Sequence, residues 1–268
     1  MKSFIDKVAV VTGAGSGIGR AIALRLASEG AIVHCVDLNK ENANAVAREC
    51  GNGDSHQVDV SNADAMRTLA EALFSNGSHV DILINNAGVA HAGNIVDCEL
   101  EDWRRLLDVN VMGVVHGIHA FLPRMLEQKT AGYIVNTASG AGLFANPGMG
   151  PYCMSKHAIV GLSQVLAAEL HETPINVTIL CPGIVNTPIV GATQFRGYSE
   201  GRKEKIRALY EKRAATPDRI ATDLLKAMRK RKLFCITPRM EVGLGWYLHR
   251  LSPKLALAAS RRMMKMLK

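Results

Sequence analysis

The sequence predicts an α/β fold, in which one domain is built around a doubly wound, seven-stranded parallel sheet with helices on both faces. Short apolar runs, typical of buried strands, alternate with longer segments of helical pattern along most of the chain. With 268 residues, 48% of them hydrophobic, the chain can bury the core that such a sheet needs. A glycine-rich turn also joins the first strand to the first helix, which is typical of the opening unit of doubly wound sheets.

Seven apolar runs predict the strands, at residues 8–11, 32–36, 56–60, 80–84, 133–137, 175–180 and 233–237. Helices are expected between them: two ending near Glu29 and Cys50, one opened by a capping box at residues 61–64, and three at about 101–127, 151–172 and 218–230. Residues 184–214 break this alternation, and we expect a lid insertion at about residues 186–214. A domain of residues 1–238 and a C-terminal extension of residues 239–268 follow from this division.

Net charge is unevenly spread along the chain. Residues 1–195 hold 12 Lys and Arg against 18 Asp and Glu, a net charge of −6, and residues 196–268 hold 20 against 6, a net charge of +14. The overall charge of +8 therefore comes from the last quarter of the chain, which needs its own explanation.

The extension is expected to end in a basic amphipathic helix that begins at Ser252-Pro253, an N-cap followed by a first-turn proline. One side would gather Lys254, Arg261, Arg262, Lys265 and Lys268, and the other Leu255, Ala259, Met263, Met266 and Leu267, with Trp246 and Tyr247 just upstream. Such a helix can lie on an anionic membrane or pack on the enzyme or another subunit. Nucleic-acid binding is not expected, because no recognition motif is present.

Other features favour a cytoplasmic location. No run of about 18 apolar residues predicts a spanning helix, and the first residues lead directly into a strand without a signal peptide. The six cysteines are scattered without a CxxC pair, and are expected to be free thiols. His116 and His119 stand three apart, but they lack partner ligands, so we expect no metal site.

The turn after the first strand reads Thr12-Gly13-Ala14-Gly15-Ser16-Gly17-Ile18-Gly19. Glycines there permit a tight turn and let backbone amides approach a pyrophosphate, which a helix N-terminus attracts. Such a turn is weak evidence alone. The strand before it, the helix after it and Asp37 at the end of the second strand together predict a dinucleotide site.

Asp37 is expected to select the cofactor. A carboxylate there can accept hydrogen bonds from the two hydroxyls of the adenosine ribose and would repel a 2′-phosphate. Ser16 and Leu38, where a phosphate partner could stand, are uncharged, although the flexible Lys40 could reach this region. The sequence therefore favours NAD over NADP.

The segment from Ser139 to Lys156 indicates the chemistry. Tyr152 and Lys156 stand at i and i+4, so they share one face of the expected helix. A free tyrosine is a poor acid or base near neutral pH, but an ammonium beside it favours the phenolate. Ser139, delivered from the preceding strand, can hold the oxygen of a carbonyl or alcohol. This arrangement suits proton transfer coupled to hydride transfer.

With these residues the chain resembles the short-chain dehydrogenases/reductases over about residues 5–238. The matching motifs are Thr12-Gly-x-x-x-Gly17-x-Gly19, Asn85-Asn86-Ala87-Gly88, Asn110, Ser139, Tyr152-x-x-x-Lys156 and Pro182-Gly183, in the family's order and spacing. The resemblance implies a Rossmann-like domain with oxidoreductase activity. It also implies a homodimer or homotetramer, because many relatives assemble through the helices that correspond to residues 101–127 and 151–172.

The resemblance assigns roles to individual residues. Tyr152 would be the general acid or base, Ser139 would bind the substrate oxygen, and Asn110 would keep a water in a proton relay through Lys156. Lys156 would also hold the nicotinamide ribose. Cofactor contacts are implied for Gly13, Ser16, Gly17, Ile18, Gly19, Asp37, Asp59, Val60, Asn86, Gly88, Tyr152, Lys156, Pro182, Gly183 and Thr187, with Asp59 and Val60 at the adenine and Thr187 at the carboxamide. Taken singly, Asn110, Ser139 and Asp59 could merely serve a helix bend, a strand end and a turn.

The substrate pocket is expected to be apolar. Residues 130–155 carry no charged side chain. The loop after Ser139 supplies Leu143, Phe144 and Met149. Together with Ser139 and Tyr152, these residues would bind a lipophilic alcohol or ketone, steroid- or retinoid-like. These side chains could instead only pack the helix on the sheet. Basic lid residues, Arg196, Arg202, Lys203 and Lys205, keep a 3-oxoacyl thioester reductase open as an alternative. A cofactor-sensing or scaffold protein of the same fold is the alternative from another class.

Overall fold

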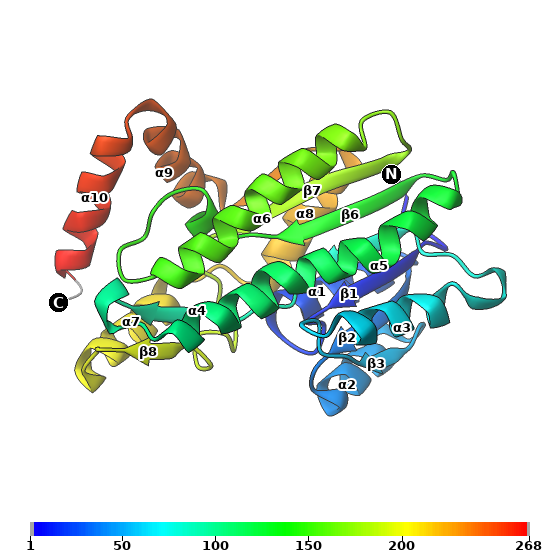
Figure 1. The fold of residues 1–268 in the computed structure, drawn as a ribbon, viewed down its shortest axis with the longest axis horizontal. Helices are drawn as coiled ribbons and strands as arrows, with labels where there is room; N and C mark the ends of the chain where they lie inside the picture. The colour runs from blue at the N-terminus through cyan, green and yellow to red at the C-terminus, as the bar shows by residue number, and fades with distance from the viewer. Residues whose placement is uncertain (1–2, 267–268) are drawn as a thin grey trace.

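The computed structural model describes residues 3–266 and confirms a sheet of seven parallel strands between two layers of helices (Figure 1). Its strands are β1 (Val8–Thr12), β2 (Ile32–Asp37), β3 (Ser55–Gln57), β4 (Ile82–Asn85), β6 (Gly132–Thr137), β7 (Ile175–Pro182) and β9 (Phe234–Thr237). Their order across the sheet is β3-β2-β1-β4-β6-β7-β9. The chain winds outward in both directions from β1 and β4, so the switch point at which such sheets bind ligands lies between these two strands.

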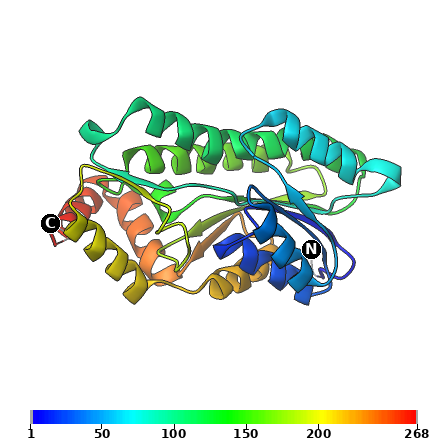
Figure 2. The same cartoon turned by 90° about the horizontal axis from the view of Figure 1, so that it is seen from below.

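Ten α-helices are assigned within the described residues: α1 (Gly17–Ser28), α2 (Lys40–Cys50), α3 (Ala63–Leu73), α4 (Leu100–Leu107), α5 (Gly113–Glu127), α6 (Gly150–Glu169), α7 (Glu200–Arg213), α8 (Pro217–Arg229), α9 (Arg239–Leu251) and α10 (Pro253–Met266). Figure 2 shows the sheet edge-on, with α3, α5 and α6 on one side and the blue and gold helices α1, α2 and α8 on the other. The predicted coverage of both faces is therefore confirmed.

The core follows from the period of two in the strands. In β4, every residue is buried, and Leu83 points into the apolar cluster formed with α3 and α5. Its neighbours Ile82 and Ile84 point into the opposite cluster, with Ile22 of α1 and Leu224 of α8. A strand enclosed on both faces must be apolar on both, which explains the continuous apolar runs of the sequence.

Some predicted boundaries were wrong. The third strand ends at Gln57, short of the predicted residue 60. The helix after it begins behind Asn62, whose side chain accepts a hydrogen bond from the Ala65 amide (3.0 Å), so a single Asn cap replaces the predicted capping box. The pattern also gave no sign of β5 (His91–Gly93) and β8 (Gln194–Arg196), which pair in parallel outside the main sheet. Both are three-residue strands outside the main sheet, without the apolar run that marked the seven predicted strands.

The long helix predicted at residues 101–127 is continuous from Leu100 to Glu127, but a π-helical turn at Asp108–Met112 interrupts its regular winding. Among the described residues it is the one helix that is long and apolar enough to cross a membrane by length and composition alone. The sequence analysis considered only uninterrupted apolar runs, and it therefore missed a helix whose mean hydropathy is high although polar residues interrupt it. In the structure, the helix packs against α3 and α6 along the sheet (Figure 1).

The C-terminal extension folds as α9 and α10 and packs on the domain. In Figure 1 it lies with the lid elements α7 and β8 beyond the carboxyl ends of the strands. Trp246 of α9 stacks on Phe234 with ring centres 5.2 Å apart. The predicted apolar face of α10 is divided in the structure: Leu255 is 61% exposed, Ala259 lines the cavity, and the neighbouring Ala256 is 8% exposed. The side chains of Met263 and Met266, and residue Leu267, lie outside the described part of the chain.

Candidate active site

The glycine-rich turn is shaped by close approach to the chain at the end of β4. Gly13 has φ of +64°, and a Cβ atom there would lie 2.8 Å from the Ala87 Cα atom. Gly17 also has a positive φ, +55°. A Cβ atom on Gly19 would lie 2.1 Å from the Gly13 carbonyl oxygen, so this glycine lets α1 approach the turn and lies outside the cavity lining. Gly19 thus has a packing role, and its cofactor contact stays a prediction.

The N-terminus of α1 opens into one large cavity of about 1260 Å³. Its lining includes Gly13, Ser16, Gly17 and Ile18, and Ser16 caps the helix without a side-chain hydrogen bond. The first amides of the helix therefore face the cavity, which is the arrangement that binds a pyrophosphate. Sites for one small ligand usually span about 300–1,000 Å³, so this cavity has room for two molecules.

Asp37 closes the cavity at the end of β2. Its Oδ2 atom accepts a hydrogen bond from the Gly15 amide (2.8 Å), and its Oδ1 atom accepts one from the Asn39 amide (2.9 Å). These two amides orient the carboxylate, which lines the cavity beside the turn. The glycines of the turn and the open N-terminus of α1 fit the pyrophosphate of a dinucleotide, and the fixed Asp37 carboxylate fits its ribose.

The segments that follow β4 and β3 complete this part of the cavity wall. The Asn86 side chain donates a hydrogen bond to the Thr12 carbonyl oxygen (3.1 Å), and it lines the cavity with Gly88. Asp59 and Val60 line it as well, while Asp59 Oδ1 also accepts from the Ser61 amide (2.9 Å). Asp59 therefore caps a turn and reaches the cavity, so its two interpretations are compatible.

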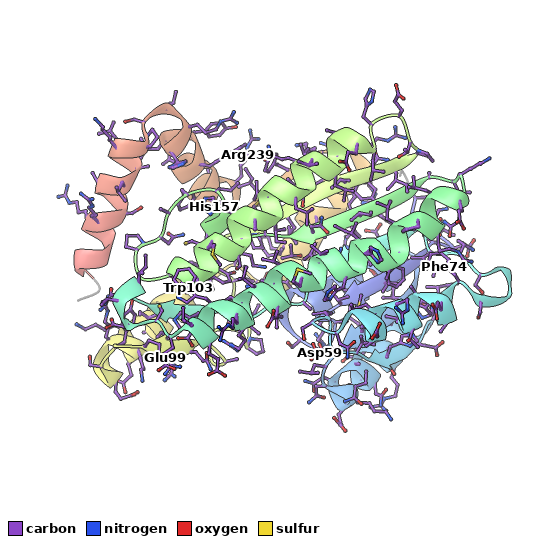
Figure 3. All side chains as sticks on the ribbon, viewed as in Figure 1. Asp59, Phe74, Glu99, Trp103, His157 and Arg239 are labelled. Carbon is purple, nitrogen blue, oxygen red and sulfur yellow. The ribbon has the colours of Figure 1, made fainter. Side chains whose placement is uncertain are left out.

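Lys156 and Tyr152 project from the inner side of α6, whereas His157, labelled in Figure 3, is exposed on the outer side. The Lys156 ammonium donates a hydrogen bond to the Thr137 carbonyl oxygen (2.8 Å) and lies 5.9 Å from the centre of the Tyr152 ring. Burial lowers the pKa of Lys156 to about 8. A Cβ atom on Gly88 would lie 3.5 Å from Nζ, so this glycine keeps the space beside the ammonium open.

Asn110 lies in the π-helical turn and is fully buried. Its Oδ1 atom accepts a hydrogen bond from the Val89 amide (2.8 Å), and its Nδ2 atom donates to the Val89 carbonyl oxygen (3.0 Å) and to Ser155 Oγ (3.0 Å). Ser155 in turn donates to the Tyr152 carbonyl oxygen (2.9 Å). Asn110 thus ties the cavity wall to the helical turn that bears Tyr152, and it lies outside the lining. Ser155 is a link that the sequence analysis missed, although its place between Tyr152 and Lys156 on a buried helix was a signal.

Ser139 lies at the end of β6, where its Oγ atom accepts a hydrogen bond from the Ala141 amide (3.1 Å). The hydroxyl hydrogen remains to donate toward the cavity that Ser139 lines. Pro182, Gly183 and Thr187 line the same cavity, and Thr187 packs against the turn, 3.1 Å from where a Cβ atom on Gly17 would be.

The far end of the cavity is apolar. Phe144 and Met149 line it as predicted, but Leu143 is 5% exposed and packs in the core cluster with Ile159 and Val242. The predicted substrate contact of Leu143 is wrong, because the short helical turn after Ser139 directs this side chain inward. Lid and extension supply wall residues that the sequence analysis missed: Phe195, Tyr198, Ile206, Leu248, Ala256 and Ser260. The aromatic residues Phe195 and Tyr198, close together in the lid sequence, were the available signal.

No group of three or more His, Cys, Asp or Glu side chains suited to a metal ion occurs among residues 3–266. His116 instead contacts the Val60 carbonyl oxygen through Nδ1 at 2.9 Å.

Known proteins are similar to this chain in sequence and fold. A family model described as short chain dehydrogenase matches residues 7–195. The chain is 37% identical over 239 residues to "Probable oxidoreductase EphD" of Mycobacterium tuberculosis, an alignment that covers 85% of this chain and 40% of that protein. The chain therefore spans less than half the length of this relative.

Two solved structures are similar over nearly their whole length. One is a short-chain dehydrogenase/reductase from Burkholderia phymatum in complex with NAD, 33% identical, with a TM-score of 0.88 and coverage of 95% of this chain and 96% of that one. The other is a 3-ketoacyl-(acyl-carrier-protein) reductase from Brucella melitensis complexed with NADH, 30% identical, with a TM-score of 0.76 and coverage of 88% and 99%. Motifs, fold and family model agree, and the chain belongs to the short-chain dehydrogenase/reductase family of oxidoreductases.

Proposed function

We propose that this protein binds NAD(H) and interconverts a lipophilic alcohol, steroid- or retinoid-like in size, and its ketone or aldehyde. The observation that carries the proposal is the single cavity that runs from the glycine-rich turn, past Tyr152 and Ser139, to an apolar end. Two ligands bound end to end in such a cavity would meet at the tyrosine.

Asp37 supports NAD over NADP. The Gly15 and Asn39 amides fix its carboxylate at the cavity wall, where the adenosine ribose of a dinucleotide would lie. A 2′-phosphate there would face a negative charge at close range. Leu38, the next residue, offers no compensating cation, and Lys40 is exposed at the start of α2.

When bound, the nicotinamide ring supplies or accepts the hydride. This chain's own residues handle the proton. Tyr152 takes the proton from the substrate hydroxyl oxygen during oxidation and returns it to the carbonyl oxygen during reduction. The Lys156 ammonium stabilises the tyrosinate by its charge, and Ser139 donates a hydrogen bond to the substrate oxygen and so orients it.

The lining of the cavity supports a lipophilic substrate. Its charged residues, within the described part of the chain, are Asp37, Asp59 and Lys156, which all belong to the cofactor or catalytic regions. The far end is walled by Phe144 and Met149 from the loop, and Phe195 and Leu248 from lid and extension. Such a wall favours apolar surface on the ligand and offers no partner for a carboxylate or phosphate.

A 3-oxoacyl thioester reductase is the second candidate. Similarity to the Brucella reductase favours it, and that enzyme was solved in complex with NADH, so a preference for NAD does not argue against this activity. Two of the four basic lid residues predicted to serve a carrier are paired within the protein, Arg196 with Glu99 (2.9 Å) and Lys203 with Glu200 (2.6 Å). This engagement favours the free alcohol as the first substrate to test.

A substrate panel tests the proposal. Purified enzyme would be given NAD and secondary alcohols of increasing apolar size, and NADH with the matching ketones and with 3-oxoacyl thioesters, while absorbance of NADH is followed. Catalytic efficiency should rise with apolar size, with NAD above NADP. Efficient turnover of thioesters alone would select the second candidate. Tight NADH binding without turnover of any substrate would favour a cofactor-sensing or scaffold role.

We also propose a cytoplasmic location with reversible attachment to anionic membranes. The outer side of α9 carries an exposed apolar stripe, Met240, Leu244, Tyr247 and Leu251, at helical spacing. Basic Arg250, Lys254 and Arg261 are exposed beside its end. Each Lys or Arg near an anionic surface contributes about 1 kcal/mol before screening.

Vesicle co-sedimentation tests this attachment. The wild-type chain should bind phosphatidylserine vesicles at low salt and release them at high salt, and the double change of Leu244→Ser and Leu251→Ser should abolish binding. Leu100→Ser, at an exposed leucine of another helix, α4, is the control. If the wild-type protein does not bind the vesicles, and the double substitution of Leu244 and Leu251 instead dissociates an oligomer, the stripe is a subunit contact.

We propose a homo-oligomer, a dimer or tetramer, built on α5 and α6. A shallow apolar groove between them is lined by Val115, Ile118, Leu122 and Leu162, and Val165 is 57% exposed nearby. Light scattering after size exclusion tests the assembly. Val165→Glu should give a monomer, and a monomeric wild-type chain would contradict the proposal.

A further inference from the structure

The lid is attached to the domain at two places. At its base, the Ala215 amide donates a hydrogen bond to the Ile184 carbonyl oxygen (2.9 Å), and the Asn186 amide donates to the Ala215 carbonyl oxygen (3.0 Å). These bonds hold the two ends of the lid together. Farther out, β8 pairs with β5 in a register that places Phe195 beside Ala92 and Arg196 beside Gly93.

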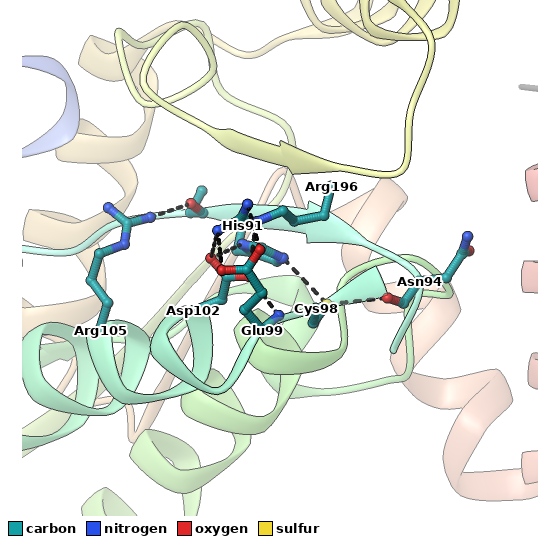
Figure 4. A network of polar contacts seen from close by, with 8 residues as sticks. His91, Asn94, Cys98, Glu99, Asp102, Arg105 and Arg196 are labelled. Carbon is teal, nitrogen blue, oxygen red and sulfur yellow. Dashed lines mark hydrogen bonds and ion pairs between the residues drawn. The ribbon is translucent and has the colours of Figure 1, made fainter. Parts of the chain in front are cut away.

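Arg196 makes the polar contacts of this outer attachment (Figure 4). Its Nε and Nη2 atoms donate to Asp102 Oδ2 (3.1 Å) and Oδ1 (3.3 Å), a two-point contact with one carboxylate. Nη1 lies 2.9 Å from Glu99 Oε1. Figure 3 shows Glu99 on the lid side of the molecule, at the start of α4. A bidentate contact of this kind fixes both the orientation of the guanidinium and its distance from the carboxylate. It therefore sets the position of β8, the strand that carries Arg196.

Asp102 is 2% exposed and depends on Arg196 for its counter-charge. The nearest other basic group is His91, whose Nδ1 atom lies 3.7 Å from Asp102 Oδ1 and has no hydrogen-bond partner in the described structure. Burial lowers the pKa of His91, so this ring is neutral at neutral pH. Its other nitrogen, Nε2, contacts Cys98 Sγ at 3.3 Å. If the lid moved away, the Asp102 carboxylate would lose the guanidinium that pairs with it, and the neutral His91 would not replace that charge, which opposes the movement.

The turn after Arg196 also packs closely against the domain. Gly197 has φ of +67°, and a Cβ atom there would lie 2.5 Å from Asp97 Oδ2. The lid backbone therefore fits closely on the segment before α4. Between this point and the base, most of the described residues 200–208 of α7 are exposed.

We propose that Arg196 and Asp102 form a latch that positions the lid over the substrate end of the cavity. Both are positioning residues, which act through Phe195 and Tyr198, the lid side chains that line the cavity on either side of the latch. Closing the latch completes the apolar wall, and opening it exposes that end to water. The effect on substrate rests on the proposed function, whereas the movement of the lid does not.

The test compares Arg196→Gln and Asp102→Asn with the matched control Lys203→Gln, which removes an ion pair internal to the lid. Lid opening is read from trypsin cleavage after Lys205 and Arg207, which all variants keep. Both latch variants should be cut about ten-fold faster than wild type, since the open fraction rises when one partner of a buried pair is lost. The control should be cut at the wild-type rate.

Activity gives the second readout. In the latch variants, KM for an apolar alcohol should rise about ten-fold while kcat changes little, because apparent affinity falls with the fraction of closed lid. Arg196→Lys, which keeps the charge and loses the fork, should recover part of the affinity. The double variant should lose no more than Arg196→Gln alone, since both changes remove the same contact.

Wild-type rates of cleavage and wild-type KM in Arg196→Gln, with its NADH affinity retained as proof of folding, would overturn the latch. If the wild-type enzyme oxidises no alcohol, the proposed substrate class fails, and trypsin cleavage still decides whether Arg196 holds the lid.

Discussion

The ammonium of Lys156 lies 5.9 Å from the centre of the Tyr152 ring, one helical turn away, and is held there by the Thr137 carbonyl oxygen at 2.8 Å. The contact fixes a buried positive charge beside the phenol without an ion pair to a carboxylate. A neutral carbonyl oxygen does not cancel the charge of the ammonium, so the electric field of this charge still acts on the phenol and favours the tyrosinate.

Tyr152→Phe is expected to reduce turnover by about 10²–10⁴-fold, the usual contribution of a general acid or base. The phenyl ring keeps the shape of the cavity wall, so NADH affinity should stay within about two-fold of wild type. Steady-state rates and fluorescence titration with NADH measure the two quantities. Substantial turnover in the phenylalanine variant would remove Tyr152 from its assigned role.

Lys156→Met is expected to change how stability depends on pH. Burial lowers the Lys156 pKa from 10.5 to about 8. Below pH 8 the side chain is charged in the folded and the unfolded chain, so the folded protein bears the whole cost of a buried ammonium. Above pH 8 the folded protein releases the proton while the unfolded chain keeps it, so the free energy of unfolding rises with pH by about 1.4 kcal/mol per unit up to the ordinary lysine pKa.

This rise is specific to the wild-type chain. Urea unfolding of wild type and Lys156→Met, without cofactor, at pH 7 and pH 10, should therefore show the wild type gaining stability relative to the variant as pH rises. Other groups titrate in both proteins and cancel in the difference. A difference that does not change with pH would show that Lys156 keeps its ordinary pKa in the fold.

Asp37→Ala is expected to narrow the preference for NAD over NADP. The change removes the charge that faces the 2′ position, and it also frees the Gly15 amide, so affinity for NAD should fall about ten-fold while that for NADP rises or holds. The ratio of kcat/KM for the two cofactors is the measurement. Asp54→Ala, at an exposed aspartate before β3, serves as the control. A wild-type enzyme equally efficient with both cofactors would contradict the assignment.

Ala256→Leu is expected to discriminate against bulky substrates. Ala256 is 8% exposed and lines the cavity from α10, so three added carbons would project into the substrate end. The value of kcat/KM should fall about ten-fold or more for the bulkiest alcohols of the panel and little for the smallest. Ala258→Leu, on the exposed side of the same helix, is the matched control. An equal loss for all alcohols would place the extension outside the substrate wall.

The sequence by itself determined the elements that depend on local pattern. The apolar runs fixed six of the seven main strands to within about two residues, and the turn Thr12–Gly19 with Asp37 located the cofactor cradle, because glycine and carboxylate are needed there for reasons of shape and charge. The spacing of Tyr152 and Lys156 located the catalytic helix, since i and i+4 must share a face.

Tertiary structure alone decided what lies across the cavity from these motifs. Leu143 and Phe144 are neighbours in sequence and both apolar, yet one is in the core and the other in the cavity wall, because a helical turn after Ser139 directs them apart. Arg196 and Asp102 are 94 residues apart, and no local pattern links them. On α10, Leu255 is exposed whereas its neighbour Ala256 lines the cavity, which the helical pattern alone did not indicate. Local periodicity specifies which residues share a face, and only the packing of whole elements specifies what that face meets.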